Sequence, residues 1–315
     1  SSAASDVYKR QIVNRSFVNE KKDNHFVDTQ KLYSASIDTF INNVVIDNNV
    51  DGLSEEFIHD SFPENTFLEI APLNLEIDNK SHLVNLDSKI IEIKNFGNFP
   101  SEFLKDQKKG VDFDLFGKKG KLLSHNLSDI QKNLIRGPQI ISPKDIAWLV
   151  YSSDVKSNDI VIEAGGGSGA LTAALAQSAF PEGKVITFEK NKKHLEIVKK
   201  NLKLSQFSDQ VELRNEELND QTEIISCNSI ILDLPDPQEL VKWAEKSLVL
   251  GGKLLCYVPT INQVENLLSS LDGWSEIEIN EMMHRTWQSR LEAMRPNTNI
   301  LGHTGFIVSA RLLNK

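Results

Sequence analysis

The chain has 315 residues, 40% of them hydrophobic, and a formal net charge of −9 at pH 7. This composition is ordinary for a soluble globular protein with one large domain and a smaller one, and no apolar run is long enough to span a bilayer. The acidic balance excludes indiscriminate binding to nucleic acid, although it allows a local basic face.

The cysteines indicate the redox compartment of the protein, and the basic residues indicate where a nucleic acid could bind. The two cysteines, Cys227 and Cys256, do not have the spacing of a metal or redox motif. We therefore expect a reducing, cytoplasmic setting, with no metal and no membrane attachment. The candidates for a local basic face are Lys105, Lys108, Lys109, Lys118, Lys119, Lys121, Arg285, Arg290 and Arg295.

The first 65 residues carry little structural signal. Residues 6–11, Asp-Val-Tyr-Lys-Arg-Gln, resemble the in-frame translation of a sequencing adapter, and no initiator methionine precedes them. We therefore predict that residues 1–11 are not native and exclude them from the fold. Residues 12–65 are polar, rich in Asn and Asp, and weakly patterned, so we expect an extension or a divergent start of the next domain.

Residues 66–125 contain short runs in which apolar and polar side chains alternate, as they do in β-strands. The expected strands are 66–70, 89–93 and 111–115, with turns at 95–98 and 117–120. This segment therefore predicts a small β-rich domain.

From residue 126 onward, helical and strand patterns alternate, which is typical of a parallel sheet covered on both faces. Asn126 is a candidate cap for the first helix. The expected helices are 127–134, 143–152, 170–179, 191–204, 238–248 and 261–271. The expected strands are 159–163, 184–188, 210–214, 229–233, 252–258, 276–280 and 305–312. The sequence thus predicts an α/β domain over residues 126–315.

The most informative segment is Val161–Thr172, where apolar residues lead into an acidic residue, a glycine-rich turn and a helix-forming run. Backbone N–H groups in such a turn, with a helix dipole behind them, receive the polar end of a nucleotide-like cofactor. Gly165, Gly167 and Ala170 satisfy the dinucleotide pattern G-x-G-x-x-G/A.

The same loop also fits a second class of cofactor. Glu163, Gly165, Gly167 and Gly169 satisfy the E-x-G-x-G-x-G pattern of enzymes that use S-adenosylmethionine (SAM). Both classes need an acidic residue at the end of the next strand to bind ribose hydroxyls, and Glu189 stands there. The loop alone therefore leaves both cofactors open, besides a turn that only packs a helix on a strand.

The segment Ser229–Pro237 helps to choose between the cofactors. An apolar strand leads into Asp233, and the prolines after it end any helix. Ligands of open α/β sheets bind at the carboxyl ends of the strands, so we expect Asp233 to face the same crevice as the glycine loop. A dehydrogenase has no need for a D-L-P-x-P turn there, whereas an enzyme that methylates a nitrogen of a flat base does. The alternative is an Asp that caps a helix in a proline turn.

Seven motifs occur in the order of one enzyme family. They are Arg136–Asp145 (RGPQIISPKD), the glycine loop, Phe188-Glu189, Leu232–Pro237 (LDLPDP), Pro259–Val264 (PTINQV), Arg295-Pro296 and His303–Phe306 (HTGF). Through them the chain resembles the tRNA (adenine-58-N1)-methyltransferases, above all their archaeal branch, over about residues 90–315. The resemblance implies a class I SAM-dependent methyltransferase fold. Such a fold has a Rossmann-like, mostly parallel seven-stranded sheet with an antiparallel terminal strand, here preceded by a small β-rich domain that helps to bind tRNA.

The resemblance also implies roles for individual residues. Asp233 is the expected catalytic carboxylate, which accepts a hydrogen bond from adenine N6–H and stabilises the cation forming on the base. The residues expected to bind SAM are Gln139, Ile141, Glu163, Gly165, Gly167, Ser168, Gly169, Ala170, Leu171, Glu189, His194, Glu216 and Asp233. The residues expected to border the opening for the base are Arg295, His303 and Thr304.

Some positions allow another interpretation or depart from the family. His194 is also typical of a surface helix, and His303 is also typical of a packing residue. Asn215-Glu216 replaces the family's usual Gly-Asp pair. Ser142 stands near the place where the family often has a Tyr that stacks at the site, so another residue is expected to supply any stacking.

The implied function is SAM-dependent methylation of N1 of adenine 58 in the T-loop of tRNA by a homotetramer, with adenine 57 left open as a second target. Two other interpretations stay open. One is a class I SAM methyltransferase that acts on another substrate, such as an isoaspartyl protein or a corrinoid precursor. The other is a non-catalytic tRNA-binding subunit, in which the glycine loop and Asp233 would be expected to decay.

Overall fold

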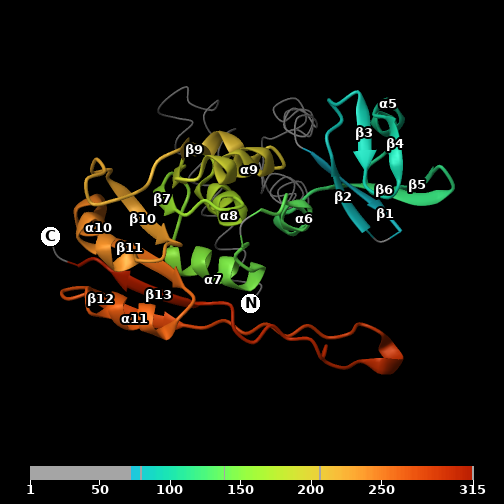
Figure 1. The fold of residues 1–315 in the computed structure, drawn as a ribbon. Helices are drawn as coiled ribbons and strands as arrows, with labels where there is room; N and C mark the ends of the chain where they lie inside the picture. Colours follow the sequence, from blue (N-terminus) through green and yellow to red (C-terminus); the bar gives the residue numbers. More distant parts are fainter. Residues whose placement is uncertain (1–71, 79, 138, 206, 314–315) are drawn as a thin grey trace, which may run out of the picture. The chain divides into compact units, whose positions relative to one another are not determined.

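The computed structural model describes residues 72–78, 80–137, 139–205 and 207–313. The expectations for residues 1–11 and 12–65, and the strand expected at 66–70, lie outside the described residues. Those described form a β-rich part followed by an α/β part (Figure 1). No helix in the described part of the chain is long and apolar enough to cross a membrane.

The β-rich part consists of an antiparallel sheet in the order β2–β1–β6–β5 and a separate hairpin of β3 and β4. Its elements are β1 (Leu73–Ile77), β2 (Lys80–Val84), β3 (Ile90–Ile93), β4 (Gly97–Pro100), α5 (Glu102–Lys105), β5 (Asp112–Leu115) and β6 (Lys118–Ser124). Each of these elements contributes buried side chains to one hydrophobic cluster, which includes Leu75, Phe99, Leu104 and Leu122. This part therefore has a core of its own.

The sequence predicted only some of these strands. β3 and β5 confirm the strands expected at 89–93 and 111–115, whereas β1, β2, β4 and β6 were not predicted. The turns expected at 95–98 and 117–120 are partly wrong, because Gly97 begins β4 and Lys118 begins β6. Both strands begin with glycine- or lysine-rich residues of low strand propensity, so pairing with their neighbours decides their conformation.

The α/β part contains one seven-stranded sheet in the order β12–β13–β11–β10–β7–β8–β9. Neighbouring strands from β11 to β9 are parallel, and β13 is antiparallel to both β11 and β12. The strands are β7 (Ile160–Ala164), β8 (Lys184–Phe188), β9 (Val211–Arg214), β10 (Cys227–Leu232), β11 (Leu248–Val258), β12 (Ser275–Asn280) and β13 (Phe306–Arg311). The expected fold class, including its antiparallel terminal strand, is confirmed.

Helices cover both faces of this sheet. They are α6 (Leu127–Asn133), α7 (Pro143–Ser153), α8 (Ala170–Ala179), α9 (Lys192–Leu202), α10 (Val241–Ser247) and α11 (Ile261–Leu268), with short 3₁₀ turns η1 (Ser208–Gln210), η2 (Pro237–Leu240) and η3 (Leu291–Ala293). The cap expected for α6 is confirmed: the side chain of Asn126 accepts from the N–H of Asp129, and the Asp129 side chain accepts from the N–H of Asn126.

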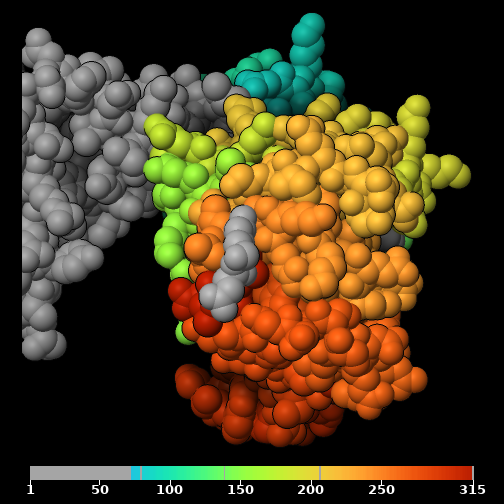
Figure 2. All heavy atoms as spheres, turned by 90° about the vertical axis from the view of Figure 1, so that its left-hand side faces the viewer, coloured from blue at the N-terminus to red at the C-terminus, as the bar shows by residue number. Residues whose placement is uncertain are grey.

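Alternation along the strands sends side chains into two cores, one on each face. In β10, Ile230 packs with α10 and α11, and Ile231 packs with α7 and α8. On the face drawn in Figure 2, residues of α10 and α11, in gold to orange, lie over the first of these cores. Because both faces are covered, only the strand ends are left to form a site.

The region from residue 238 to residue 258 differs from the expectation. The helix expected at 238–248 begins instead as the turn η2, and Leu248 already belongs to β11. The strand expected at 252–258 is therefore longer. Gly251 and Gly252 lie inside the long strand, and Gly251 has a φ of 83°, so the glycines that indicated a turn mark an irregularity within it.

Candidate active site

The loop between β7 and α8 has a backbone conformation that requires glycine. Gly165, Gly167 and Gly169 have φ angles of 90°, 56° and 79°, which other residues rarely adopt. The N–H groups of Gly165 and Gly166 both donate to the carbonyl of Phe188, at 3.0 and 3.3 Å. The loop is thereby held against the end of β8.

Asp233 follows β10 directly and lies against this loop. Its N–H donates to the carbonyl of Ala164 at 2.9 Å. A Cβ atom at Gly165 would collide with the backbone oxygen of Asp233. The structure thus brings together the glycine loop and the carboxylate that the sequence placed in the same crevice.

Glu189 lies at the end of β8, with 7% of its surface exposed. One carboxylate oxygen accepts from the N–H of Gly167 at 3.0 Å, and the other accepts from the N–H of Asn191 at 2.8 Å. These bonds fix the carboxylate between the glycine loop and the start of α9. Because each carboxylate oxygen has a further lone pair, Glu189 can still accept from two ribose hydroxyls.

Glu163 is buried in β7 beneath the loop. Its Oε2 accepts hydrogen bonds from the hydroxyls of Thr172 in α8, at 2.6 Å, and Thr187 in β8, at 2.8 Å. Burial, with smaller contributions from the charges of Asp233 and Glu189, raises the pKa of Glu163 to about 7, although the two hydroxyl hydrogen bonds lower it. This carboxyl therefore ties the helix to the sheet under the loop.

The crevice concentrates negative charge. Burial raises the pKa of Asp233 to about 6, and the charge of Glu189 contributes. Within the described ranges, neither carboxylate forms an ion pair with Lys or Arg, and Glu189 has only His194 as a partner, at 3.8 Å. Two neighbouring carboxylates without a Lys or Arg partner favour a positively charged ligand.

The remaining residues expected around the cofactor lie in different settings. Ser168, Ala170 and Leu171 are buried at the start of α8. His194 lies in the first turn of α9, and its Nε2 is 3.5 Å from the Asn191 side chain. Glu216 lies after β9, where its side chain is exposed and 4.0 Å from an Arg214 nitrogen.

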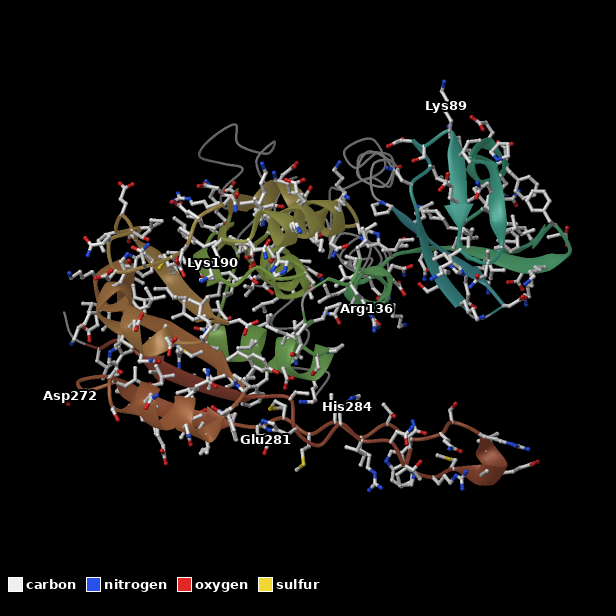
Figure 3. The ribbon with its side chains drawn as sticks, in the orientation of Figure 1. Lys89, Arg136, Lys190, Asp272, Glu281 and His284 are labelled. Carbon is white, nitrogen blue, oxygen red and sulfur yellow. The ribbon has the colours of Figure 1, made fainter. Side chains whose placement is uncertain are left out.

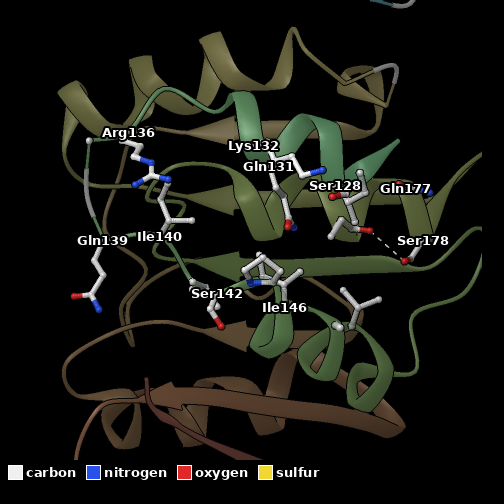
Figure 4. A pocket seen from close by; sticks show the side chains of 17 residues that line it. Ser128, Gln131, Lys132, Arg136, Gln139, Ile140, Ser142, Ile146, Gln177 and Ser178 are labelled. Carbon is white, nitrogen blue, oxygen red and sulfur yellow. Dashed lines mark hydrogen bonds between the residues drawn. The ribbon is translucent and has the colours of Figure 1, made fainter. Parts of the chain in front are cut away.

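Gln139 and Ile141 lie elsewhere, on a cavity of about 1160 Å³ between α6, α7 and α8 (Figure 4). None of the residues of the glycine loop lines this cavity, and neither do Glu189 and Asp233. The structure therefore brings Gln139 and Ile141 together on this cavity. The cavity walls are mostly apolar, with Arg136 and Lys132 among their polar residues.

A buried network next to the crevice centres on Asp145, whose surface is fully buried. Its Oδ2 accepts from the hydroxyls of Ser142 and Thr304, both at 2.7 Å, and from Tyr257 at 3.4 Å. Its Oδ1 accepts from Lys144 at 2.7 Å. The network joins the start of α7, the end of β11 and the residues before β13.

Tyr257 links this network to the crevice. Burial raises the pKa of its hydroxyl to about 12, and the nearby charges of Asp145 and Asp233 also raise it. Its ring packs against Gly305, where a Cβ atom would collide with it. Tyr257 is thus an aromatic residue close to Asp233, whereas the Ser142 hydroxyl is engaged with Asp145.

Of the three residues expected to border the opening, His303 and Thr304 are adjacent before β13, and Arg295 lies apart from them. Thr304 belongs to the Asp145 network. His303 contacts the Glu281 carboxylate through Nδ1 and the Pro259 carbonyl through Nε2, and the Glu281 carboxylate raises its pKa. Both ring nitrogens are therefore occupied by contacts that brace the chain.

Arg295 lies on a long excursion between β12 and β13, here called the arm (residues 281–304). Its Nε donates to the Gln288 side chain at 3.3 Å, and its carbonyl accepts from the Gln288 N–H at 2.8 Å. Trp287 and Pro296 form an antiparallel bridge across the arm. The arm leads away from the sheet at Glu281 and His284 (Figure 3), so Arg295 does not reach Asp233.

Sequence reasoning missed three residues of the site. Asp145 and Tyr257 form contacts over 112 residues of chain, and no local pattern reveals such a contact. Asn215 was noted only as a departure, but its side chain donates to the Glu189 carbonyl at 2.9 Å. It therefore holds the ends of β8 and β9 together at the place where the family has a glycine.

The crevice fits SAM on chemical grounds. SAM carries a positive sulfonium and a positive amino group, and the crevice holds Glu189 and Asp233 without a fixed cation. Its ribose needs two acceptors, which the fixed Glu189 carboxylate provides. The positive φ angles of the glycine loop leave bare backbone next to both carboxylates, where a ligand's polar end can approach.

Comparison with known proteins identifies relatives of this chain. The family described as the tRNA methyltransferase complex GCD14 subunit matches residues 131–304, more than half of the chain. The tRNA (adenine(57)-N(1)/adenine(58)-N(1))-methyltransferase TrmI of Methanocaldococcus jannaschii is 31% identical over 240 residues. That match covers 66% of this chain and 84% of the archaeal protein.

Two solved structures share the fold closely. The tRNA (m1A58) methyltransferase TrmI of Aquifex aeolicus is 27% identical with a TM-score of 0.64, over 80% of this chain and all of that protein. A SAM-dependent O-methyltransferase of Thermotoga maritima is 26% identical with a TM-score of 0.69, over 78% of this chain and 94% of that protein. Their names state different acceptor atoms, so likeness of fold alone does not choose the substrate.

Removal of the Asp145 carboxylate should destabilise the fold. We expect Asp145→Ala to lower the free energy of unfolding by about 3–5 kcal/mol, because it leaves the largely buried Lys144 ammonium without its partner. Urea unfolding followed by tryptophan fluorescence measures the effect. The matched control is Glu196→Ala, which breaks an exposed pair with Lys199 and should cost less than about 0.5 kcal/mol. Equal unfolding midpoints for the two variants would show that the network contributes nothing to stability.

Proposed function

Because the chain belongs to the tRNA methyltransferase family described as the GCD14 subunit, we propose that it methylates N1 of adenine 58 in the T-loop of tRNA, using SAM. The observation that carries this proposal is the Asp233 carboxylate, held against the glycine loop at the tip of β10. Names of relatives in the family state the same reaction. The relative from M. jannaschii is named for adenine 57 as well, so the second target stays open.

The residues of the crevice divide the work of binding and chemistry. When bound, SAM supplies an electrophilic methyl group on a positively charged sulfur. Glu189 accepts from the ribose hydroxyls, and the backbone of Gly165–Ala170 receives the amino-acid end. Asp233 accepts from the adenine N6–H and stabilises the positive charge that develops on the ring as N1 is alkylated. Positioning and this one carboxylate are sufficient, because the displacement needs no strong base.

The base must leave the tRNA fold to reach Asp233, since N1 of a paired or stacked adenine is covered. Tyr257 is an aromatic residue close enough to Asp233 for the carboxylate to raise the pKa of its hydroxyl. The Asp145 network fixes its hydroxyl and also holds Thr304. We assign Thr304 and His303 to the support of this border, and Arg295 to the arm.

The chain divides into parts with different tasks in this proposal. Residues 126–315 form the methyltransferase domain, and residues 66–125 form a smaller domain that contacts tRNA. The separate hydrophobic cluster of the described β-rich part supports this division. The intact Gly165, Glu189 and Asp233 favour an active enzyme over a non-catalytic subunit.

We also propose that the protein assembles into a homotetramer through the arm. The arm exposes large apolar side chains that its own short bridge leaves uncovered, and such patches mark interaction surfaces. These exposed side chains are Met283, Trp287, Leu291, Met294, Ile300 and Leu301. Leu291 is 88% exposed at the outer turn of the arm.

Incubation with an unmodified tRNA transcript and labelled SAM tests the function. We expect N1-methyladenosine by nucleoside mass spectrometry, and fragment mapping should place it at adenine 58. Asp233→Asn should lower turnover by about 10²–10³, on the scale measured when one transition-state hydrogen-bond partner is lost. A transcript with guanine at position 58 is the RNA control. Absence of N1-methyladenosine with the unchanged enzyme would reject the proposal.

The pH dependence of the reaction should report Asp233. Its pKa is raised to about 6, and the carboxylate form is the active one, so kcat/KM should fall about tenfold for each pH unit below 6. Asp233→Asn should lose this inflection. Glu163→Gln should keep it, because that variant removes only the group with a pKa of about 7. If the pH profile of Glu163→Gln lacked the inflection near pH 6, the titration would not belong to Asp233 alone and the prediction would be wrong.

The tetramer should depend on the tip of the arm. We expect the double variant Trp287→Ser, Leu291→Ser to have a lower molar mass than the unchanged protein by size-exclusion chromatography with light scattering. The matched control is Leu250→Ser, which changes a 60% exposed leucine on β11. An unchanged molar mass of the double variant would exclude the arm as the contact.

A further inference from the structure

Phe116 is held in an unfavourable conformation at an exposed position. With Gly117 it forms the two-residue turn between β5 and β6, with φ angles of 52° and 83°. Turns with two positive φ angles are dominated by Asn-Gly and Asp-Gly, and bulky residues rarely adopt them. Yet 62% of Phe116 is exposed. Its ring contacts the buried Phe99 with 5.7 Å between centroids, but most of the side chain stays exposed in a strained turn.

The ring of Phe116 is the outermost member of an aromatic platform, which consists of Phe96, Phe103 and Phe116. Phe103 stacks on Phe116 with 5.2 Å between ring centroids and 24° between planes. Phe96 lies 6.4 Å from Phe116. The Nζ of Lys118 lies 5.8 Å from the centre of the Phe96 ring. The platform thus combines an exposed aromatic face with a cation beside it, although this cation is also paired with Asp78 at 2.8 Å.

Lysines are concentrated in the part of the chain that carries the platform. Residues 72–125 contain nine lysines against eight acidic residues, although the whole chain has a net charge of −9. Lys105, Lys108 and Lys109 follow Phe103 closely, and none of them forms an ion pair with any residue that the structure describes. Their ammonium groups are therefore available to an anionic partner.

We propose that this platform stacks an unpaired nucleobase of the tRNA, with the neighbouring lysines on the backbone phosphates. The proposal rests on the proposed function and adds a substrate contact outside the crevice. Every nucleobase has a π face, so stacking on an aromatic side chain recognises unpaired bases of any sequence. An aliphatic residue in an unstrained turn would serve a purely hydrophobic contact, whereas exposed aromatic rings in a lysine-rich segment match an RNA loop.

Affinity of the full chain for unmodified tRNA, measured by fluorescence anisotropy at fixed salt, tests the platform. Phe116→Leu keeps the apolar side chain and the strained turn but loses the aromatic face, so we expect Kd to rise about 5- to 100-fold. Phe116→Trp should stay within twofold of the unchanged protein. The matched control Val111→Ala, at a 53% exposed residue of the same part, should also stay within twofold. Calorimetry should give the same SAM affinity for all four proteins.

A stability measurement separates this role from a structural one. Phe116→Asn restores the residue that the turn prefers, so we expect Tm to rise by about 2–4 °C while tRNA affinity falls. A fall in Tm would make Phe116 a structural residue and overturn the proposal. Equal tRNA affinity for Phe116→Leu and the unchanged protein would also overturn it. So would a loss of molar mass in Phe116→Leu, because it would make the platform a contact between copies. Failure of the unchanged protein to methylate tRNA would instead reject the proposed function itself.

Discussion

The candidate site depends on one close approach of backbone to backbone. Ala164 and Leu232 are paired in the parallel strands β7 and β10, so the residues that follow them, Gly165 and Asp233, meet at the same edge. Contact is possible only because Gly165 has no Cβ atom, and its φ of 90° turns the loop toward α8. The acidic residue of one strand and the bare backbone of another thus share a crevice that neither could form alone.

The charge of the carboxyl groups at this edge determines which ligand and which reaction the site favours. Burial and the charge of Glu189 raise the pKa of both Glu163 and Asp233, and among the described residues only His194 forms an ion pair with any of these three carboxyl groups. Repulsion among these carboxylates is unfavourable in the protein alone, and a bound cation relieves it. It is also favourable when positive charge moves from a sulfonium to a base. The same carboxylates that attract the cofactor therefore stabilise the product of the transfer.

How well the sequence predicts each element depends on how far apart in the chain the residues that form it lie. The strands that end at Ala164, Phe188 and Leu232 are local apolar runs, and the sequence located each within a residue or two. β6 was missed because its lysines hide the alternation, and its conformation depends on pairing with β1, which lies 45 residues earlier. The Asp145 network could not be predicted, since its partners come from three distant segments.

That network also explains why separate motifs occur together. Asp145 ends the motif that begins at Arg136, and it binds Thr304 of the HTGF motif. His303 of the same motif contacts Pro259, the first residue of the PTINQV motif. Three motifs that are far apart in the sequence are therefore one physical unit at the edge of the crevice. A change in one of them alters the support of the other two, so the order of motifs that marks the family reflects a single set of contacts around Tyr257.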